Sequence, residues 1–407
     1  MPNILKIEFS PLTPLWTGNI DRDSAEPVVS GLLGSLRWWF EGIIRGMGGY
    51  TCDPAGDEKD SSKKKCLFDG KHIEAVCPAC RVFGCTGLSR SFRLDVQGLE
   101  ALPLFFICDP RVFVSHGNWL IRIYEGFRER RSDGTSFGFN NSQLWATSSA
   151  KLLFTPNSLT LAKRGLNAEQ LTNILYYLLS VISKFGSLGA KGQNGFGQIA
   201  LDSETSMSDW KMQARQALNI LVEQFKDANP DSAKNARQND PDWFSLDQFF
   251  SYTYKIPDAG VYQRPGSCRV IGDEKTFRQH SDRFLPCAFD IRYRRSLRNP
   301  ATQRGEDIGF RPYAKNSLRR SGSPDYEELV KALGSPAKDG DRKRKASRIF
   351  VSHLYKQKST DPEWSLKVWG ALKRTWYELF NDYITSSEMF PKAKIDENAT
   401  FAWEDWK

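Results

Sequence analysis

The sequence predicts an α+β fold with two packed sheet-and-helix domains, and three observations support this fold class. Strand-like and helix-like segments alternate through the first 200 residues. The chain has 407 residues, more than a single domain usually contains. No stretch reaches the roughly 20 apolar residues of a membrane span, and the longest near-continuous apolar run is 174–182. We therefore expect a globular protein with a large core and no membrane partner.

The first half contains elements of both kinds. Alternating residues predict strands at 5–11, 92–96, 119–127 and 150–155, with a further strand in the segment GQIALDS at 197–203. Apolar residues at helical spacing predict a helix from residue 29 that ends at Gly48-Gly49, and a second helix over 171–182. The apolar positions of the first helix are Val29, Leu32, Leu33, Leu36, Phe40, Ile43, Ile44 and Met47.

This order of strand, helix, strands, helix and strand is typical of a ferredoxin-like fold, whose sheet carries its helices on one face. We expect an N-terminal ferredoxin-like domain at 1–207 and a more elaborate ferredoxin-like domain at 208–407. The second domain is predicted to contain a strand at 289–293 and a helix over 369–383, with a polar loop at 227–242.

The positive charge is concentrated in one segment. Residues 292–348 contain 16 Lys and Arg against 7 Asp and Glu, which accounts for the whole net charge of +9. A basic region of this kind favours a polyanionic partner. The alternative is a solvated basic loop without a partner.

Four cysteines lie within twenty residues, in an insertion at about 50–87. Cys77 and Cys80 form a CxxC pair, and Cys66 and Cys85 flank it. Such a group can hold one tetrahedral structural zinc ion. Unrelated buried cysteines and a redox pair are the alternatives.

Two more residues compete for the same metal. Cys52 and His72 lie close in sequence, so the spacing does not decide which side chains complete the site. The N-terminus lacks the pattern of a signal peptide, and we expect a cytoplasmic protein with reduced thiols.

A glycine cluster follows the second helix. Five of the twelve residues from 186 to 197 are glycine, within the segment SLGAKGQNGFG. The spacing fits neither a P-loop nor a dinucleotide fingerprint. Two interpretations remain: a backbone that approaches phosphates, assisted by Lys191, Gln193 and Asn194, or a tightly packed turn. None of the four histidines lies in a catalytic motif, so no catalytic residue is predicted.

Five segments together resemble the RAMP proteins of CRISPR systems, the RNA-binding subunits of type III effector complexes. They are LTPLWTGN, GLLGSLRWWFEGIIR, CPACRVFG, RSFRLDV and LGAKGQNGFG, all within the first 200 residues. The G-x-x-G-S-L-R-W-W helix, joined to a basic C-terminal half, is most similar to the first subunit of the Cmr (type III-B) complex. The last 200 residues resemble it only loosely, through RKRKASRIFVSHLY and the final aromatic helix.

The resemblance implies RRM-like (ferredoxin-like) domains, a glycine loop against RNA, and a structural zinc in the cysteine insertion. It also implies a non-catalytic subunit that caps a filament of related subunits and contacts the 3′ part of the guide RNA and the single-stranded target RNA. The candidate RNA contacts are Arg37, Arg45, Arg90, Arg93, Lys191, Gln193, Asn194, Arg342, Arg344, Lys345 and Arg348. A metal-independent guide-processing RNA endonuclease and a structural protein that binds acidic partners are the alternatives.

Arg37 allows two interpretations. It lies away from the apolar stripe of the first helix, and Trp38 and Trp39 follow it. It can contact a phosphate while a tryptophan stacks on a base. Alternatively, it pairs with Glu41 on a solvated face, worth about 0.3–0.5 kcal/mol, while the tryptophans fill the core.

Overall fold

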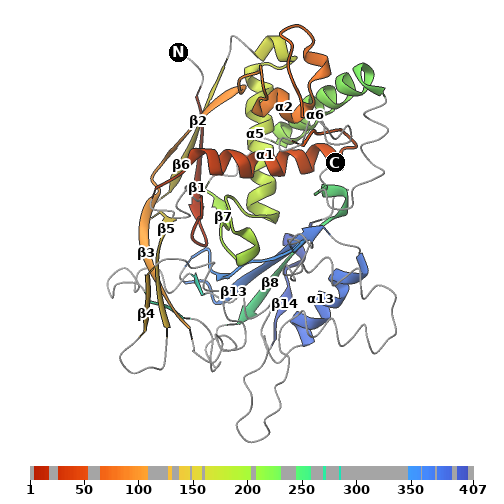
Figure 1. Cartoon of the computed structure of the whole chain (residues 1–407). Helices are drawn as coiled ribbons and strands as arrows, with labels where there is room; N and C mark the ends of the chain where they lie inside the picture. Colours follow the sequence, from red (N-terminus) through yellow and green to blue (C-terminus); the bar gives the residue numbers. More distant parts are fainter. Residues whose placement is uncertain are drawn as a thin grey trace, which may run out of the picture.

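The computed structural model shows a mixed α+β protein with antiparallel sheets, which confirms the predicted α+β class (Figure 1). The structure describes residues 4–17, 26–53, 65–108, 127–130, 137–146, 149–157, 161–202, 208–230, 244–257, 269–271, 284–285, 347–358, 360–371, 374–386 and 392–401.

The first sheet contains the strands of the N-terminal half in the order β2-β6-β1-β7, and every neighbouring pair is antiparallel. These strands are β1 (Leu5–Pro11), β2 (Phe92–Gln97), β6 (Ala150–Pro156) and β7 (Ile199–Leu201). Helix α1 (Val29–Gly46) connects β1 to β2, and α5 (Ala168–Phe185) connects β6 to β7. This strand order with two helical crossovers matches the order of strands in a ferredoxin-like sheet.

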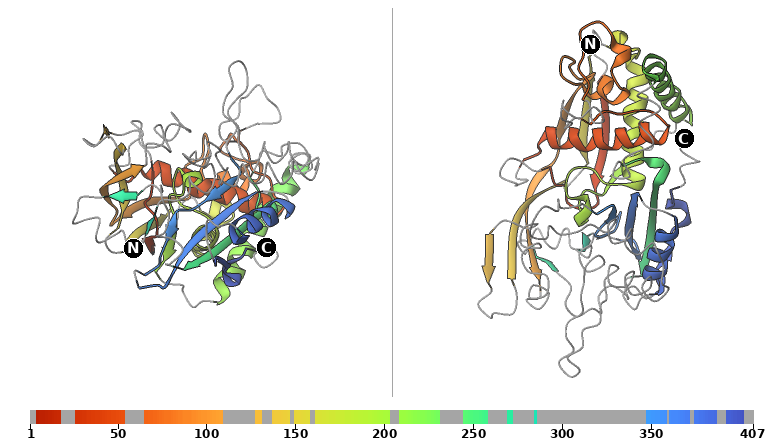
Figure 2. Two further views of the ribbon diagram at one scale, coloured as in Figure 1. Left: turned by 90° about the horizontal axis from the view of Figure 1, so that it is seen from below. Right: turned by 45° about the vertical axis from the view of Figure 1, so that its right-hand side comes forward.

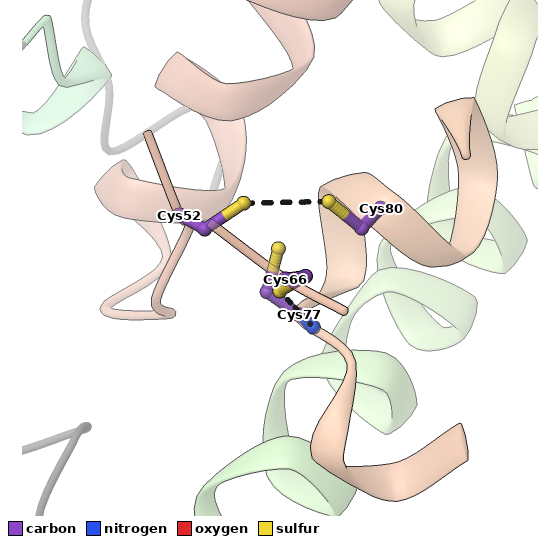
Figure 3. A group of neighbouring side chains, drawn as sticks. All are labelled: Cys52, Cys66, Cys77 and Cys80. Carbon is purple, nitrogen blue, oxygen red and sulfur yellow. Dashed lines mark hydrogen bonds between the residues drawn. The ribbon is translucent and has the colours of Figure 1, made fainter. Parts of the chain in front are cut away.

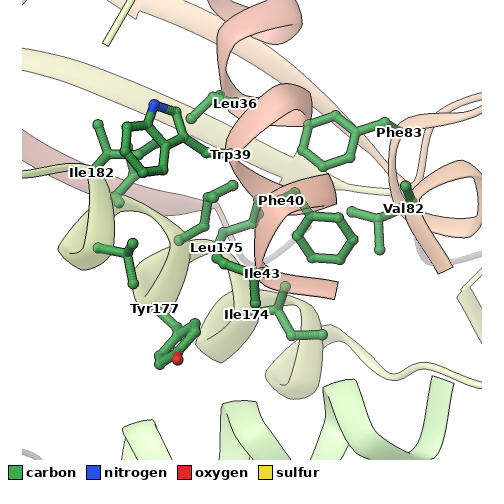
Figure 4. Packing of buried hydrophobic residues seen from close by; sticks show 14 of the residues in the cluster. Leu36, Trp39, Phe40, Ile43, Val82, Phe83, Ile174, Leu175, Tyr177 and Ile182 are labelled. Atoms are coloured by element: carbon green, nitrogen blue, oxygen red, sulfur yellow. The ribbon is translucent and has the colours of Figure 1, made fainter. Parts of the chain in front are cut away.

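The core of this half lies between α1, α5 and the sheet (Figure 4). Trp39 and Ile43 of α1 are buried together with Leu175 and Ile182 of α5. Helix α5 begins at a capping box, in which the Asn167 side chain accepts a hydrogen bond from the backbone N–H of Gln170. The capping box and the apolar stripe explain why this segment forms a helix of 18 residues.

Two further helices enclose the same core. The short helix α2 (Pro78–Phe83) follows the 3₁₀ turn η2 (Ile73–Ala75), and η3 (Ala162–Arg164) precedes α5. Helix α6 (Ser208–Ala228) packs on α5 and on η2. None of the helices in the described ranges is long and apolar enough to cross a bilayer.

A second sheet extends from the first, and its long strands β3 and β5 continue in the direction of β2 and β6 (Figures 1 and 2). Its order is β4-β5-β3-β9. The strands are β3 (Glu100–Cys108), β4 (Phe127–Arg130), β5 (Phe137–Trp145) and β9 (Arg269–Ile271). A bridge between Leu15 and Leu144 joins this sheet to the loop after β1.

The third sheet belongs to the C-terminal half and has the order β10-β12-β13-β8-β14, with β11 also paired to β13. Its strands are β8 (Phe249–Pro257), β10 (Phe284–Leu285), β11 (Ile349–Val351), β12 (Leu354–Tyr355), β13 (Glu363–Ala371) and β14 (Lys394–Ile395). Helix α13 (Arg374–Ser386) lies beside β8 and β14 (Figures 1 and 2), and the 3₁₀ turns η5 (Leu246–Gln248) and η6 (Glu397–Ala399) flank the sheet.

The C-terminal half differs from the expectation in the start of its last long helix. The helix expected from residue 369 begins at Arg374, because Trp369 belongs to β13 and is buried in that strand. Strand β13 is buried along nearly its whole length, so its apolar residues do not show the alternation that identifies a half-exposed strand. The strand expected at 289–293 lies outside the described residues, as does all of 119–127 except Phe127, the first residue of β4.

Candidate functional site

Four cysteine side chains converge beside α1 and α2 (Figure 3). The sulfur atoms of Cys52, Cys66, Cys77 and Cys80 all lie within 4.8 Å of one another. Cys77 is the N-cap residue of α2 and Pro78 is its first residue, so the start of this helix holds Cys77 and Cys80 on adjacent turns. Cys52 comes from the segment after α1, and Cys66 comes from the segment that leads back to η2.

This group has the geometry of a single-metal site. A tetrahedral zinc ion with Zn–S bonds of about 2.3 Å needs sulfur atoms about 3.8 Å apart. The Cys52 and Cys80 sulfur atoms are 3.4 Å apart, which is too long for a disulfide bond. All four cysteines are free, and Cys52, Cys77 and Cys80 are buried. The cysteine cluster can therefore hold a metal ion, and four thiolates are a typical donor set for structural zinc.

The composition of this cluster differs in one member from the expected set. The set expected from the sequence had Cys85 as its fourth member, with Cys52 and His72 as competitors, and the group that converges contains Cys52. Cys85 is partly buried at the edge of the cluster, where its hydrogen bond with Cys80 lowers the pKa of the Cys85 thiol. His72 is exposed, and its Nδ1 lies 2.7 Å from the Asp69 carboxylate rather than near the sulfurs.

Arg37 is turned toward the cysteine cluster and bonds within the protein, and its contact with RNA stays a prediction. Its Nε bonds Glu41 at 2.8 Å, its Nη1 bonds the carbonyl of Gly84 at 3.0 Å, and its Nη2 lies 3.2 Å from the Cys80 sulfur. Its side chain is only 17% exposed. Burial lowers the pKa of Arg37, but the Cys80 and Glu41 interactions outweigh burial and raise it. Arg37 thus pairs with Glu41, as in the second interpretation, but in a buried network rather than on a solvated face.

Arg45 belongs to the same network two turns further along α1. It donates to the carbonyl of Phe244 at 2.7 Å and lies 3.2 Å from the second Glu41 oxygen. Its side chain is also mostly buried, because residues before β8 cover this face of α1. The Arg45 side chain therefore bonds within the protein, and its contact with RNA stays a prediction.

The glycine cluster is a tightly packed turn between the two halves. The Trp39 ring occupies the space that a Cβ on Gly186 would need, and the indole N–H of Trp39 bonds the carbonyl of Ser187 at 2.9 Å. Gly195 has φ of 96° and lies against His353 of the C-terminal half. Close packing therefore explains these glycines, as the second interpretation of this segment predicts.

The polar residues of the glycine loop lie instead along a groove of about 390 Å³. Trp38, Trp39 and Ser35 of α1 line one side, and Phe350 and Trp369 of the C-terminal sheet contribute another. The loop itself contributes Lys191, Gln193 and Asn194.

Trp38 is the one large aromatic side chain of this groove that is classed as exposed, at 36%. Its ring stacks on Phe244 with a centroid distance of 3.9 Å and an angle of 10°. The sequence leaves the core or base stacking as alternatives for the two tryptophans, and the structure separates them: both line the groove, but Trp39 is buried and Trp38 is exposed. The helical spacing of α1 contained the signal, because Trp39 continues its apolar stripe and Trp38 does not.

Two of the loop residues that line the groove contact other parts of the chain. The Lys191 ammonium lies over the Trp16 ring, 3.1 Å from its centroid, and Gln193 donates to the carbonyl of Ser347 at 3.3 Å. Asn194 is half-buried in the groove wall. The backbone N–H groups of Asn194 and Gly195 also donate within the protein, to the carbonyls of Lys191 and Gly192.

The other predicted contacts are dispersed. Arg90 and Arg93 are exposed near the start of β2, where Arg93 lies 3.1 Å from Asp95. Arg348 is half-buried next to β11. Arg342, Arg344 and Lys345 lie outside the described residues.

The fold and the site define a mixed α+β protein with a ferredoxin-like first sheet, a four-cysteine cluster and a polar groove beside the glycine loop. Residues 8–200 of this chain match the family model of the RAMP superfamily. The match covers the segments that carry the resemblance in the sequence and confirms that resemblance.

Comparison with other proteins gives likenesses at low identity. No curated protein sequence matches. The structure is similar to Cmr1 from Pyrococcus furiosus in its apo form, with 14% identity, a TM-score of 0.37, and coverage of 97% of this chain and 98% of that one. It is also similar to a chain of the type III-B Cmr-beta complex bound to cognate target RNA, with 12% identity, a TM-score of 0.37, and coverage of 94% and 100%.

Proposed function

We propose that this protein is a non-catalytic, RNA-binding subunit of a type III-B CRISPR (Cmr) effector complex. In this role it caps the end of a filament of related subunits and contacts the 3′ part of the guide RNA and the single-stranded target RNA. The match of residues 8–200 to the RAMP superfamily model supports the effector class. The assignment to the first Cmr subunit rests on the GLLGSLRWW segment and the basic C-terminal half.

The observation that carries the proposal is the groove between α1 and the glycine loop. Trp38 offers an exposed indole on which an unpaired base can stack. Gln193 and Asn194 of the glycine loop line the same groove. Such a combination of a stacking surface and polar side chains suits single-stranded RNA with little sequence preference.

The composition of the groove also favours binding without catalysis. Among the described residues that line it there is no histidine and no carboxylate. Of the two histidines within the described ranges, His353 is fully buried and His72 pairs with Asp69 at an exposed position. General acid–base cleavage of RNA requires proton-transfer groups within reach of the scissile phosphate.

We also propose two structural features of this subunit. The cysteine cluster binds one structural zinc ion through Cys52, Cys66, Cys77 and Cys80. The chain contains two ferredoxin-like domains, 1–207 and 208–407. The order β13-β8-β14, with α13 between β13 and β14, supports the second domain, because it matches strands 3, 1 and 4 of that fold. Helix α6 begins at Ser208 and attaches the start of the second half to α5.

The groove is tested by fluorescence anisotropy with a labelled single-stranded RNA. We expect Trp38→Ala to weaken binding by about 1–3 kcal/mol, the usual worth of one base–aromatic stack. The matched control is Trp210→Ala, because Trp210 is a partly buried tryptophan of α6 that packs on Tyr176 away from the groove. Equal affinity of both variants and the unchanged protein would contradict the assignment of the groove. Cleavage of the RNA in the same samples would favour the endonuclease alternative.

The basic segment is tested by the salt dependence of the same binding. Each phosphate neutralised on single-stranded RNA contributes about −0.7 to the slope of log affinity against log salt. Replacing Arg342, Arg344 and Lys345 together by glutamine should make the slope shallower by up to about 2. An unchanged slope would show that this segment does not contact the phosphates.

A further inference from the structure

The inner face of the C-terminal sheet carries a polar patch. In the antiparallel register of β8 and β13, Lys255 pairs with Ser365 and Thr253 pairs with Lys367. Because side chains alternate along a strand, these four residues share one face. The opposite face carries the buried apolar residues Tyr254, Ile256, Trp364 and Leu366.

This polar patch opens into a cavity of about 290 Å³ between the two halves of the chain. The last turns of α5 contribute Ser180, Ser183 and Lys184, and β7 contributes residues 199–201. Thr253, Ser365 and Lys367 are buried, whereas Lys255 is partly exposed at the rim. This cavity shares no lining residue with the groove beside Trp38.

Lys367 is the unusual residue of the cavity. It is 3% exposed, and its ammonium donates one hydrogen bond of 2.7 Å to the carbonyl of Ser183 in the last turn of α5. An ammonium has three N–H donors, and a buried charge is costly without a counter-charge. Within the part of the chain that the structure describes, no carboxylate forms an ion pair with Lys367. Burial lowers the pKa of Lys367 to about 7.

The charged side chains that line the cavity favour the binding of an anion. Lys184, Lys255 and Lys367 line the cavity with a single carboxylate, Asp396, whose oxygen lies 3.7 Å from the Lys255 ammonium. The Lys255 ammonium also bonds the Ser365 hydroxyl at 3.0 Å. Ammonium and hydroxyl groups are effective donors to phosphate oxygens.

We propose that this cavity is a phosphate-binding pocket, in which Lys367 and Lys255 hold the phosphate group of a nucleotide-sized ligand and Ser365 and Thr253 donate hydroxyl hydrogen bonds to it. The volume is close to the lower end of small-ligand sites, about 300 Å³, and therefore leaves space for more than the phosphate itself. The phosphate can come from a free nucleotide or from the end of an RNA strand. The pocket does not depend on the proposed role of the groove.

Isothermal titration calorimetry of the full chain with inorganic phosphate and with uridine 5′-monophosphate tests the proposal. We expect saturable binding to the unchanged protein and an at least tenfold loss of affinity in Lys367→Met. The control is Lys358→Met, a lysine at an exposed position beyond β12, which should bind as the unchanged protein does. No binding of either probe, or equal binding by Lys367→Met, would overturn the proposal.

Two additions keep the test decisive. If Lys367→Met does not fold, Lys255→Met replaces it, with the same expected loss and the same contrary outcome. A short RNA with a 5′-phosphate is compared with the same RNA without it, to identify the source of the phosphate. If Lys367→Met weakens the binding of the phosphorylated strand alone, the source is an RNA end. Trp38→Ala should bind phosphate as the unchanged protein does. The test of RNA binding in the groove and the test of phosphate binding in this pocket can therefore fail independently.

Discussion

Gly195 packs directly against the His353 ring, which occupies the space that a side chain at position 195 would need. A Cβ on Gly195 would lie 2.7 Å from Nδ1 of His353, and the backbone N–H of His353 donates to the Gly195 carbonyl at 3.3 Å. The imidazole also meets the Phe196 ring edge to face, with a centroid distance of 5.0 Å. Through these contacts the glycine loop of the N-terminal half is attached to the segment between β11 and β12.

The first prediction follows from this contact. Gly195→Ala should lower the free energy of unfolding by about 2 kcal/mol or more, because alanine is strained at a φ of 96° and its methyl group meets a buried ring. Urea unfolding measures the change. Gly34→Ala is the control: Gly34 lies in α1 with no atom near its missing Cβ, so alanine should stabilise by about 0.5–1 kcal/mol. Equal effects of the two substitutions would refute this account of the loop.

The second prediction concerns acid. Burial lowers the pKa of His353 to about 3, below the unfolded value of 6.5. Between these values the unfolded chain binds more protons at this residue than the folded chain. The stability that His353 contributes is therefore complete above pH 6.5 and declines as the pH falls toward 3, by up to about 1.4 kcal/mol per pH unit.

Urea unfolding from pH 7 to pH 4 tests this prediction by comparison with His353→Gln, which should show a weaker loss of stability in acid. His72→Gln is the control, because the Asp69 carboxylate raises the pKa of His72. The contribution of His72 is present below its unfolded pKa and is lost as the pH rises, which is the opposite direction. Parallel pH profiles for the unchanged protein and His353→Gln would contradict the burial of a neutral His353.

The third prediction distinguishes the two cysteine sets. Cys52→Ser should abolish stoichiometric zinc in the purified protein, because it removes one of four converging sulfurs. Cys85→Ser should retain the zinc, because Cys85 lies at the edge of the cysteine cluster. Elemental analysis of both variants decides the matter. Retention of zinc in Cys52→Ser together with its loss in Cys85→Ser would restore the set expected from the sequence.

The fourth prediction concerns Arg37. Arg37→Ala should destabilise the fold by about 2–3 kcal/mol, because it leaves the Glu41 carboxylate buried without one of its two partners. The folded variant should bind RNA as the unchanged protein does. Arg93→Ala is the matched control for stability, because the Arg93–Asp95 pair is exposed and contributes little. A variant with normal stability and weakened RNA binding would show that Arg37 contacts RNA instead.

Much of the N-terminal fold was predictable because its signals are local. The apolar stripe of α1, the capping residue Asn167 and the alternation in β2 each involve residues within a few positions of one another. The order of these elements then predicts the first sheet. Strand β13 was missed for the converse reason, because burial on both faces removes the alternation that identifies a strand.

The sequence by itself determined the fold class, the RAMP segments of the first 200 residues and the presence of a cysteine cluster with a CxxC pair. Only the tertiary structure decided that Cys52 joins this cluster, that Arg37 is turned toward it and that Trp38 stacks on Phe244 at the groove. The physical reason is that each of these outcomes depends on a partner far away in the chain. Arg37 bonds the carbonyl of Gly84, Trp38 stacks on Phe244, and Gly195 makes room for His353, and no local pattern specifies contacts over such separations.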